Sequence, residues 1–291
     1  MSRPLVHVLG CGRAARVVVR WLSESGQVDV GQICNRSLDS ARSAVDFIGS
    51  GQAVEQLDES ITAGWLLLGL PDGQLEAAVL GLACRMPGQA ALAFHLSGSM
   101  PSAVLEPLGV PFASVHPVRA FARPESALAA MPGTWCVAEG NAAILVALEE
   151  IFSAAGGRWL TLEAAHKARY HAAMVAASNL LVTLTDLSRR LAISAGLPAE
   201  SAAAVLHSLQ QGALDNLADS PAAEALTGPV ERSDPATCQR LLEAVAASEQ
   251  DPHQLFRILS LATLDLAVKK RGQQAGDPDL HQLLSTENPS S

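Results

Sequence analysis

The sequence predicts an α/β protein in which a parallel-sheet domain, residues 1–162, is followed by an all-helical domain, residues 163–291. In the first half, short apolar runs alternate with amphipathic segments, which is the pattern of a parallel sheet flanked by helices. A Gly-x-Gly turn separates the first of these runs from the first helical segment. Beyond Ala164, long helical patterns follow one another with no strand pattern between them. At 291 residues the chain is long enough for both domains to bury a core.

The expected elements of the first domain follow from this alternation. Strands are expected where apolar runs are bounded by turn residues. They cover residues 5–10, 28–34, 64–70, 91–97, 112–117, 134–140 and 158–163. Helices fit between them at residues 13–24, 38–48, 73–85, 101–107 and 141–155.

The second domain is expected to contain only helices. Residues 164–196 contain no proline and reach a glycine only at their end, so they predict one long helix. Further helical patterns cover residues 199–217, 235–248 and 252–270.

Charge and cysteine usage exclude several classes of protein. The net charge is −9, and neither half carries the basic surface that a nucleic-acid binder needs. The five cysteines form no CxxC pair, which indicates reduced thiols and no metal site. No apolar run reaches 18 residues and none at the start resembles a signal peptide. We therefore expect a soluble, cytoplasmic protein with no nucleic-acid or membrane partner.

The first glycine turn has the spacing of a Rossmann-like dinucleotide-binding site. Gly10 allows the tight turn, Gly12 lets a pyrophosphate approach the backbone, and Ala15 takes the third position, which tolerates alanine. The helix that begins near Arg13 then directs its free N–H groups, including that of Ala14, at the phosphates. A ligand-free glycine turn remains the alternative.

The end of the second strand decides which dinucleotide is favoured. NAD sites usually place an acid there, whereas this chain has Asn35, Arg36 and Ser37. A guanidinium pairs with a 2′-phosphate that a carboxylate would repel, so the sequence predicts NADP as the cofactor. The alternative is that Arg36 is a solvated charge and Ser37 a helix N-cap.

Two more strand ends are expected along the cofactor. Leu70 and Pro71 follow the third expected strand, and Ser97 ends the fourth. Asp72 lies along the cofactor or caps the next helix; both interpretations stay open.

Candidate catalytic residues lie at strand ends and on the long helix. His116, like His95, ends a strand at the edge where ligands of parallel sheets bind. At 100° per residue, Lys167, His171 and Ser178 share one helical stripe, flanked by Tyr170 and Asn179. Either Lys167 or His171 could protonate an oxygen or nitrogen as hydride arrives at the adjacent carbon. The alternatives are hydrogen-bonded core histidines and a polar domain interface.

Substrate contacts are expected from the same helix and from a later turn. Ser178 and Asn179 are the candidates on the helix. Arg232, in the polar segment 226–237, could hold a substrate carboxylate, or it pairs with Asp234.

Four motifs together resemble a known family. HLSGS, SVHPVRAF, KARYHAAMVAASN and ALTGPVERSD occur in the order seen in bacterial proteins with a Rossmann-like N-terminal half and an uncharacterised helical C-terminal half. That family resembles a branch of the 6-phosphogluconate-dehydrogenase-like superfamily, similar in layout to pyrroline-5-carboxylate reductases, imine reductases and deazaflavin-dependent NADP reductases. The resemblance spans roughly residues 5–270 and implies NADP and a homodimer whose helical halves pack together.

Two departures limit what the resemblance carries over. Ser233 stands where the family often has glycine, and His171 stands where relatives acting on hydroxy acids have asparagine four residues after the lysine. The expected function is an NADP(H)-dependent oxidoreductase that transfers hydride to or from a C=O or C=N bond of a small polar substrate. The alternative is a sensor or scaffold that binds NADP without turnover.

Overall fold

The computed structural model of the protein describes residues 3–247 and 253–285. The chain divides into two units, Met1–Ser178 and Asn179–Ser291. The first unit is built around an eight-stranded sheet. The strand order is β3-β2-β1-β4-β5-β6-β7-β8, and all neighbours are parallel except β6 and β7. The strands are β1 Leu5–Leu9, β2 Asp29–Cys34, β3 Gln52–Val54, β4 Trp65–Leu68, β5 Leu92–His95, β6 Phe112–Pro117, β7 Trp135–Gly140 and β8 Arg158–Thr161. The α/β fold class is thus confirmed.

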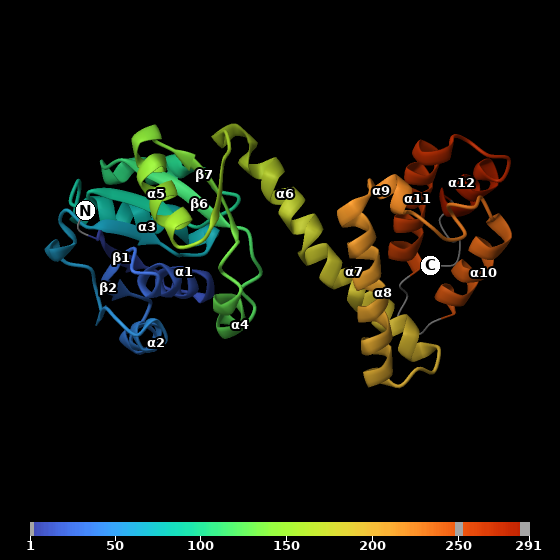
Figure 1. Cartoon of the computed structure of the whole chain (residues 1–291), viewed down its shortest axis with the longest axis horizontal. Helices are drawn as coiled ribbons and strands as arrows, with labels where there is room; N and C mark the ends of the chain where they lie inside the picture. The colour runs from blue at the N-terminus through green and yellow to red at the C-terminus, as the bar shows by residue number, and fades with distance from the viewer. Residues whose placement is uncertain (1–2, 248–252, 286–291) are drawn as a thin grey trace. The chain divides into compact units, whose positions relative to one another are not determined.

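Helices cover both faces of this sheet (Figure 1). They are α1 Arg13–Glu24, α2 Leu38–Ile48, α3 Asp72–Arg85, α4 Pro124–Ala129 and α5 Ala142–Ala154, with 3-10 turns η1 Glu59–Ile61, η2 Ser102–Leu108 and η3 Ala164–His166. Helix α6, Lys167–Ala177, follows η3 and contributes no residue to either core. One core lies under α1, α2 and α5, and the other under α3 and η2. Along β4, Leu67 belongs to the first core while Leu66 and Leu68 belong to the second, as expected for a strand covered on both faces.

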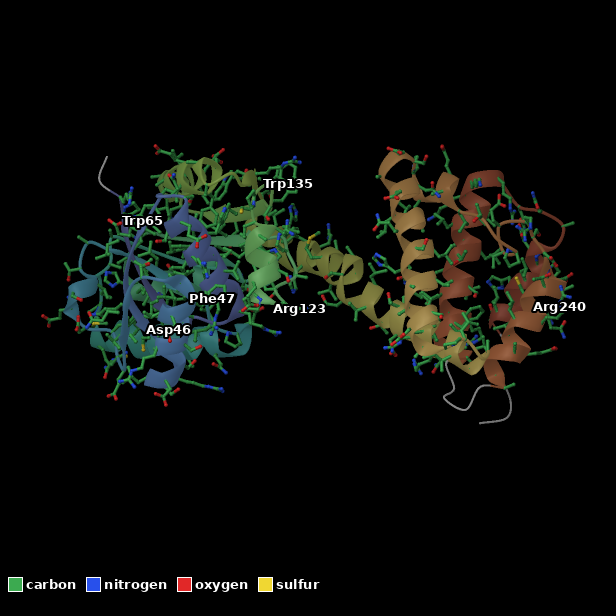
Figure 2. The ribbon with its side chains drawn as sticks, turned by 60° about the horizontal axis from the view of Figure 1, so that its bottom comes forward. Asp46, Phe47, Trp65, Arg123, Trp135 and Arg240 are labelled. Carbon is green, nitrogen blue, oxygen red and sulfur yellow. The ribbon has the colours of Figure 1, made fainter. Side chains whose placement is uncertain are left out.

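The helix α2 is held against α1 by an aromatic contact as well as by its apolar face. The guanidinium groups of Arg16 and Arg20 lie 5.8 and 5.1 Å from the centre of the Phe47 ring. Figure 2 labels Phe47. Arg20 also donates to the Phe47 carbonyl at 2.8 Å.

The strand order reverses between β1 and β4, which makes their carboxyl ends the topological switch point where open α/β sheets bind ligands. The Gly10 turn and the Gly69–Pro71 segment meet there, since Gly69 donates its N–H to the Leu9 carbonyl at 3.0 Å.

The structure differs from the sequence prediction at β7. A fully parallel sheet was expected, but Pro117 pairs with Cys136 and Ala113 with Gly140, so β7 runs antiparallel to β6. The connection contains only the six-residue α4, which does not carry the chain across the sheet as a full crossover helix would. The short elements β3, α4 and η1 also lack a strong sequence pattern.

The expected long helix is divided in two. Helix α6 ends at Ala177 and α7 begins at Asn179, because Ser178 departs from helical geometry with φ −121° and ψ −64°. The Ser178 hydroxyl donates to the Met174 carbonyl at 2.9 Å, a bond that competes with the backbone ladder and bends helices.

The second unit is helical throughout its described residues. It contains α7 Asn179–Ser194, α8 Ala199–Asp219, α9 Ala222–Ala225, α10 Pro235–Ala246, α11 His253–Arg271 and α12 Asp277–Ser285. Residues 248 and 252, at the ends of two expected helices, lie outside the described residues. Among the residues that are described, no helix is long and apolar enough to cross a membrane.

The first unit extends to Ser178, whereas the sequence places the domain boundary after residue 162. The difference arises because α6 is bonded to the sheet: Lys167 donates to the Ser97 carbonyl and Tyr170 contacts His116. Because these contacts are polar, they produce no apolar periodicity from which the sequence could predict that α6 belongs to the first unit.

We predict that Gly69→Ala destabilises the first unit by about 1–3 kcal/mol, because an added Cβ would lie 2.3 Å from the Gly10 carbonyl oxygen and 2.4 Å from the Ala15 Cβ. Urea unfolding followed by tryptophan fluorescence measures this, since all four tryptophans lie in this unit. The control Gly81→Ala, at an open position inside α3, should raise the free energy of unfolding by up to about 1 kcal/mol. Equal effects of the two substitutions would contradict the close packing at Gly69.

Candidate functional site

The turn after β1 needs glycine for two different reasons. Gly10 has φ +80°, and a Cβ there would lie 2.5 Å from the Leu70 Cδ2 atom. Gly12 has ordinary extended backbone, but a Cβ on it would meet nothing nearer than the Gly69 carbonyl at 3.8 Å. The second glycine therefore leaves an open backbone surface, which is where a pyrophosphate is expected to lie.

The N-terminus of α1 is uncapped by any side chain. Gly12 is the N-cap, and the first turn of α1 contains no acidic residue. The N–H groups of Arg13 and Ala14 have no hydrogen-bond acceptor among the described residues. Together with the helix dipole, these groups suit an anion. Ala15, at the third position of the motif, is buried beside Gly69 and keeps α1 close to the sheet.

The three polar residues after β2 have different roles. Asn35 accepts from the Cys11 N–H at 2.5 Å and donates to the Ser40 carbonyl at 3.0 Å, so its amide ties the glycine turn to α2. Ser37 is the N-cap of α2 and accepts from the Ser40 N–H. Arg36 is exposed and has no hydrogen bond or ion pair with any described residue, so its guanidinium is available to a ligand.

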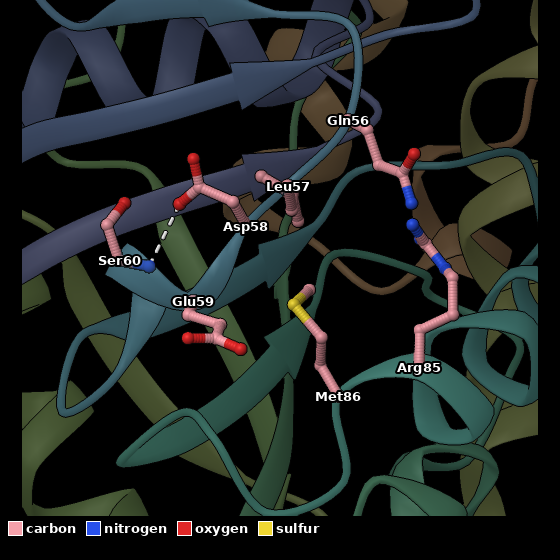
Figure 3. A pocket seen from close by; sticks show the side chains of 7 residues that line it. All are labelled: Gln56, Leu57, Asp58, Glu59, Ser60, Arg85 and Met86. Carbon is pink, nitrogen blue, oxygen red and sulfur yellow. Dashed lines mark hydrogen bonds between the residues drawn. The ribbon is translucent and has the colours of Figure 1, made fainter.

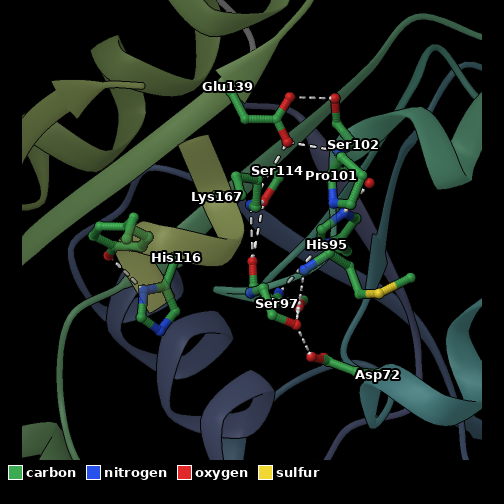
Figure 4. Close-up of polar contacts among 12 residues, drawn as sticks. Asp72, His95, Ser97, Pro101, Ser102, Ser114, His116, Glu139 and Lys167 are labelled. Atoms are coloured by element: carbon green, nitrogen blue, oxygen red, sulfur yellow. Dashed lines mark hydrogen bonds and ion pairs between the residues drawn. The ribbon is translucent and has the colours of Figure 1, made fainter. Parts of the chain in front are cut away.

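The loop after β5 is fixed on several sides by polar contacts (Figure 4). The Ser97 hydroxyl accepts from the backbone N–H groups of Ser99 and Met100. Asp72 accepts from the Ser99 hydroxyl, while Pro71 is the N-cap of α3. Of the two interpretations of Asp72, capping is therefore wrong, and its carboxylate instead links the ends of β4 and β5.

A buried ion pair joins α6 to the sheet. Lys167 and Glu139 have side chains only 3% and 5% exposed, and their charged atoms lie 3.6 Å apart. The Lys167 ammonium also donates to the Ser97 carbonyl at 3.0 Å and to the Ser114 hydroxyl. Glu139 accepts from the Ser102 N–H at 2.6 Å and the Ser102 hydroxyl at 2.7 Å. The ammonium thus makes two hydrogen bonds and one ion pair within the protein, which compensates for its burial.

The charge of Lys167 is one of the causes that lower the pKa values of two histidines, His95 and His116. Burial, with the nearby Lys167 charge as a smaller cause, lowers the pKa of His95 to about 4. Burial, followed by the charges of His171 and Lys167, lowers the pKa of His116 to about 4. His95 is fully buried, accepts from the Ser97 N–H at 3.1 Å and is a hydrogen-bonded core residue.

Two histidine side chains converge on Gly98, and Tyr170 contacts one of them. The Nδ1 atom of His116 lies 2.7 Å from the Tyr170 hydroxyl, and its ring meets that of His171 edge-on at 5.9 Å. A Cβ on Gly98 would lie 2.5 Å from the His171 Nδ1 atom and 3.0 Å from the His116 Nε2 atom. His171 Nδ1 is buried without a hydrogen-bond partner among the described residues. A buried polar atom without a partner is rare in folded proteins and marks this nitrogen as a candidate for function.

The remaining predicted site residues lie at the end of this unit and in the next. Ser178 is exposed at the end of α6, and Asn179 begins α7. Arg232 is exposed in the loop before α10, and Asp234 is the N-cap of that helix, accepting from the Thr237 N–H at 3.0 Å. Their contact with substrate stays a prediction.

Ser233 shows why the family often has glycine at this position. It adopts the left-handed conformation with φ +56°, and its hydroxyl donates to Asp277 at 2.8 Å. Asp277 is buried and paired with Arg271 at 2.9 Å, so the serine replaces glycine's backbone freedom with a hydrogen bond.

Sequence reasoning missed Glu139, Ser102 and Ser114. The signal was present, because a carboxylate within the apolar strand at 134–140 needs a buried partner, and Lys167 is the lysine on an otherwise apolar helix face. Only the antiparallel pairing of β6 and β7 sets Glu139 opposite Ser114, and this pairing was not predicted.

Two pockets lie away from these residues. One, of about 560 Å³, is lined by Gln56, Asp58 and Arg85 beside the end of α3, where the Arg85 and Gln56 side chains point toward one another (Figure 3). Another, of about 230 Å³, lies within the second unit between Pro229, Cys238 and Phe256. Neither contains a predicted site residue.

Comparisons with known proteins agree with this architecture. Residues 134–263 match the model of a family described as Domain of unknown function (DUF2520). Among curated proteins, none matches the chain.

Several solved structures share the fold. Protein TM1727 from Thermotoga maritima is 25% identical, with 92% of this chain and 99% of that chain covered and a TM-score of 0.68. BF3122 from Bacteroides fragilis, whose assignment as an NADP oxidoreductase is provisional, is 20% identical over 90% and 98%, with a TM-score of 0.76. The pyrroline carboxylate reductase of Plasmodium falciparum, with NADP bound, is 10% identical over 98% and 100%, with a TM-score of 0.57. The predicted resemblance is thus confirmed: a DUF2520 region within the fold of these reductases, with a helical C-terminal part.

We predict that the first unit loses stability as the pH falls from about 6.5 toward 4. The buried His95 has its pKa lowered from 6.5 to about 4, so the unfolded chain binds a proton in this range that the folded one does not. The contribution of His95 is at most about 3 kcal/mol. Urea unfolding at a series of pH values measures the slope.

The variant His95→Asn keeps an acceptor near the Ser97 N–H and removes the titrating ring, so it should flatten this slope. His207→Asn, at an exposed position of α8 in the second unit, serves as the control. An unchanged slope in His95→Asn would show that the stability loss has another source.

Proposed function

We propose that this protein is an NADP(H)-dependent oxidoreductase that transfers hydride to or from a C=O or C=N bond of a small polar substrate. The observation that carries the proposal is the placement of the open glycine turn and of His116 at the same, carboxyl edge of the sheet. A dinucleotide on the turn extends along that edge toward the β5 and β6 ends. The fold it shares with NADP-using reductases supports this choice.

The chain's own atoms fit an NADP molecule. Gly10, Gly12, Arg13 and Ala14 would hold the pyrophosphate on open backbone and free N–H groups. Arg36 would pair with the 2′-phosphate. The residues expected along the remaining cofactor are Asn35 and Ser37 beside the ribose, then Leu70, Pro71 and Ser97. Asn35 and Ser37 already serve the protein's own turns, so Arg36 carries most of the preference for NADP.

When bound, the nicotinamide supplies the hydride, and the protein supplies orientation and a proton. His116 and His171 are the groups proposed to meet the reacting oxygen or nitrogen, because their unbonded ring nitrogens converge beside Gly98. Lys167 acts through them: its ammonium is held by an ion pair with Glu139 and by hydrogen bonds to Ser114 and the Ser97 carbonyl, so it positions the loop, and its charge helps keep His116 neutral.

The helical unit is proposed to form a homodimer. Helices α7 and α8 carry exposed apolar side chains, among them Val182 and Leu209, each 70% exposed. An apolar surface of this kind on a helix pair is typical of a subunit interface. Ser178, Asn179 and Arg232 are proposed to contact the substrate, with Arg232 holding a carboxylate if the substrate has one.

Binding and turnover measurements test the proposal. Fluorescence titration should show tighter binding of NADPH than of NADH, and Arg36→Ala should weaken NADPH binding by roughly 10- to 150-fold with little effect on NADH, because it removes a charge-assisted contact. The control Arg42→Ala removes an exposed arginine of the same unit that is paired with Asp39, and should change neither affinity. NADPH absorbance should then fall when a panel of small ketones, keto acids and imines is added.

Different outcomes contradict different parts. Absence of binding to either nucleotide refutes the proposal as a whole. Equal weakening of NADPH and NADH binding by Arg36→Ala removes the NADP assignment. Binding of NADPH with no consumption across the panel, unchanged in His171→Gln, favours a sensor or scaffold instead.

A further inference from the structure

Tyr170 and His116 form a hydrogen-bonded pair from two separate elements. The Tyr170 hydroxyl on α6 lies 2.7 Å from the Nδ1 atom of His116 on β6, and the rings meet edge-on at an angle of 82°. Both side chains are partly buried, and Tyr170 is the single tyrosine of the chain. Tyr170 contacts the Nδ1 atom of His116, whereas the Nε2 atom of the same ring lies near Gly98.

The direction of this hydrogen bond follows from acidity. A phenol is a stronger acid than the N–H of a neutral imidazole, and an imidazole nitrogen accepts better than a phenol oxygen. Burial raises the pKa of Tyr170 to about 12, so the hydroxyl keeps its proton, while burial lowers the pKa of His116 to about 4, so its ring is neutral. The hydroxyl therefore donates to Nδ1, and the ring proton of His116 is on Nε2.

The Nε2 atom that carries this ring proton lies beside Gly98, next to His171. The His116 Nε2 and His171 Nδ1 atoms both lie within 3.0 Å of the position that a Cβ on Gly98 would take. His171 Nδ1 has no hydrogen-bond partner among the described residues. One nitrogen is then a donor and the other lacks a partner among the described residues, and both lie beside Gly98.

We propose that Tyr170 holds His116 in its Nε2–H tautomer and is the origin of the proton that His116 delivers to the reacting atom of the substrate. The delivery half of this proposal rests on the proposed function, whereas the tautomer half does not. Tyr170 acts through His116 and is thus a positioning and relay residue.

The proton transfer balances as a relay. The Nε2–H bond of His116 breaks as an O–H bond forms on the substrate oxygen, whose new electron pair comes from the C=O bond that the hydride has reduced. At the same time the Tyr170 O–H bond breaks and an Nδ1–H bond forms. The starting tautomer is restored when the tyrosinate takes the proton back from Nδ1 while Nε2 takes a proton from water. The relay is downhill because an alkoxide is a much stronger base than a phenolate, even one whose pKa is about 12.

The relay also explains how a neutral imidazole can deliver a proton. With its pKa at about 4, His116 carries no second proton near pH 7, so it cannot serve as an imidazolium acid. Loss of Nε2–H alone would leave an imidazolate, which is far too basic to form. Gain of the Tyr170 proton at Nδ1 avoids this species.

Nitrogen-15 NMR of histidine-labelled protein tests the tautomer without any substrate. The His116 signals are identified by their loss in His116→Gln. In the wild type we expect a pyridine-like Nδ1 and a pyrrole-like, protonated Nε2. In Tyr170→Phe, which keeps the ring and removes the hydroxyl, we expect a mixture of both tautomers. His95, whose Nδ1 accepts from the Ser97 N–H, is an internal control that should not change.

Two spectra would overturn the proposal. A protonated Nδ1 on wild-type His116 would mean that Tyr170 accepts rather than donates, and this result needs no variant to fold. An unchanged His116 tautomer in Tyr170→Phe would show that the hydroxyl does not set it.

Kinetics then test the relay separately. With a substrate in hand, Tyr170→Phe should lower kcat by roughly 10²-fold with a smaller change in KM. An unchanged kcat together with the expected spectra would refute delivery and leave the tautomer assignment. Expected spectra with no turnover in the wild type would instead count against the proposed function alone.

Discussion

The buried Lys167–Glu139 pair is the contact on which the rest of the candidate site depends. Two opposite charges that are almost fully removed from water must satisfy each other and every remaining hydrogen-bonding atom, and here Ser97, Ser102 and Ser114 complete the set. The pair links α6 to β7 and, through the Ser97 carbonyl, to the loop after β5. Because Tyr170 and His171 lie one turn further along α6, the same contact brings them to His116 and Gly98.

The opposite side of the site is shaped by close packing instead of charge. Gly10 turns under Leu70, and Gly69 lies directly against Ala15, so α1 begins close to the sheet and its N-terminus stays open. Close packing of small residues thus positions the glycine-turn half of this sheet edge, and the buried ion pair positions the histidine half. The first half has an open glycine turn and an uncapped helix N-terminus, and the second holds the neutral imidazole of His116.

Much of the fold follows from sequence because its signals are local. The turn at Gly10, the N-cap at Ser37 and the apolar period of α1 each depend on neighbouring residues, and each expected strand is found. The antiparallel direction of β7 depends on the path of the connection at residues 118–134, and the hydrophobic periodicity of that segment does not predict this path. The same limit applies to the site: Lys167 and His171 stand out on an apolar helix, but Glu139 becomes the partner of Lys167 only through the pairing of β7 with β6. Arg36 could be identified from the sequence because it is exposed and its role depends on no other residue of the chain. The roles of Asn35 and Asp72 could not, because their hydrogen bonds are to Cys11 and Ser99, which are distant in sequence.

A double-mutant cycle on Lys167→Met and Glu139→Gln measures the central contact most directly. The single substitution Lys167→Met leaves a buried carboxylate uncompensated and should cost about 3–5 kcal/mol in the free energy of unfolding, read from tryptophan fluorescence in urea. The account predicts that the double variant is destabilised by less than the sum of the two single variants, with a coupling energy of about 1 kcal/mol or more. Strictly additive effects, with both single variants close to the wild type, would contradict it.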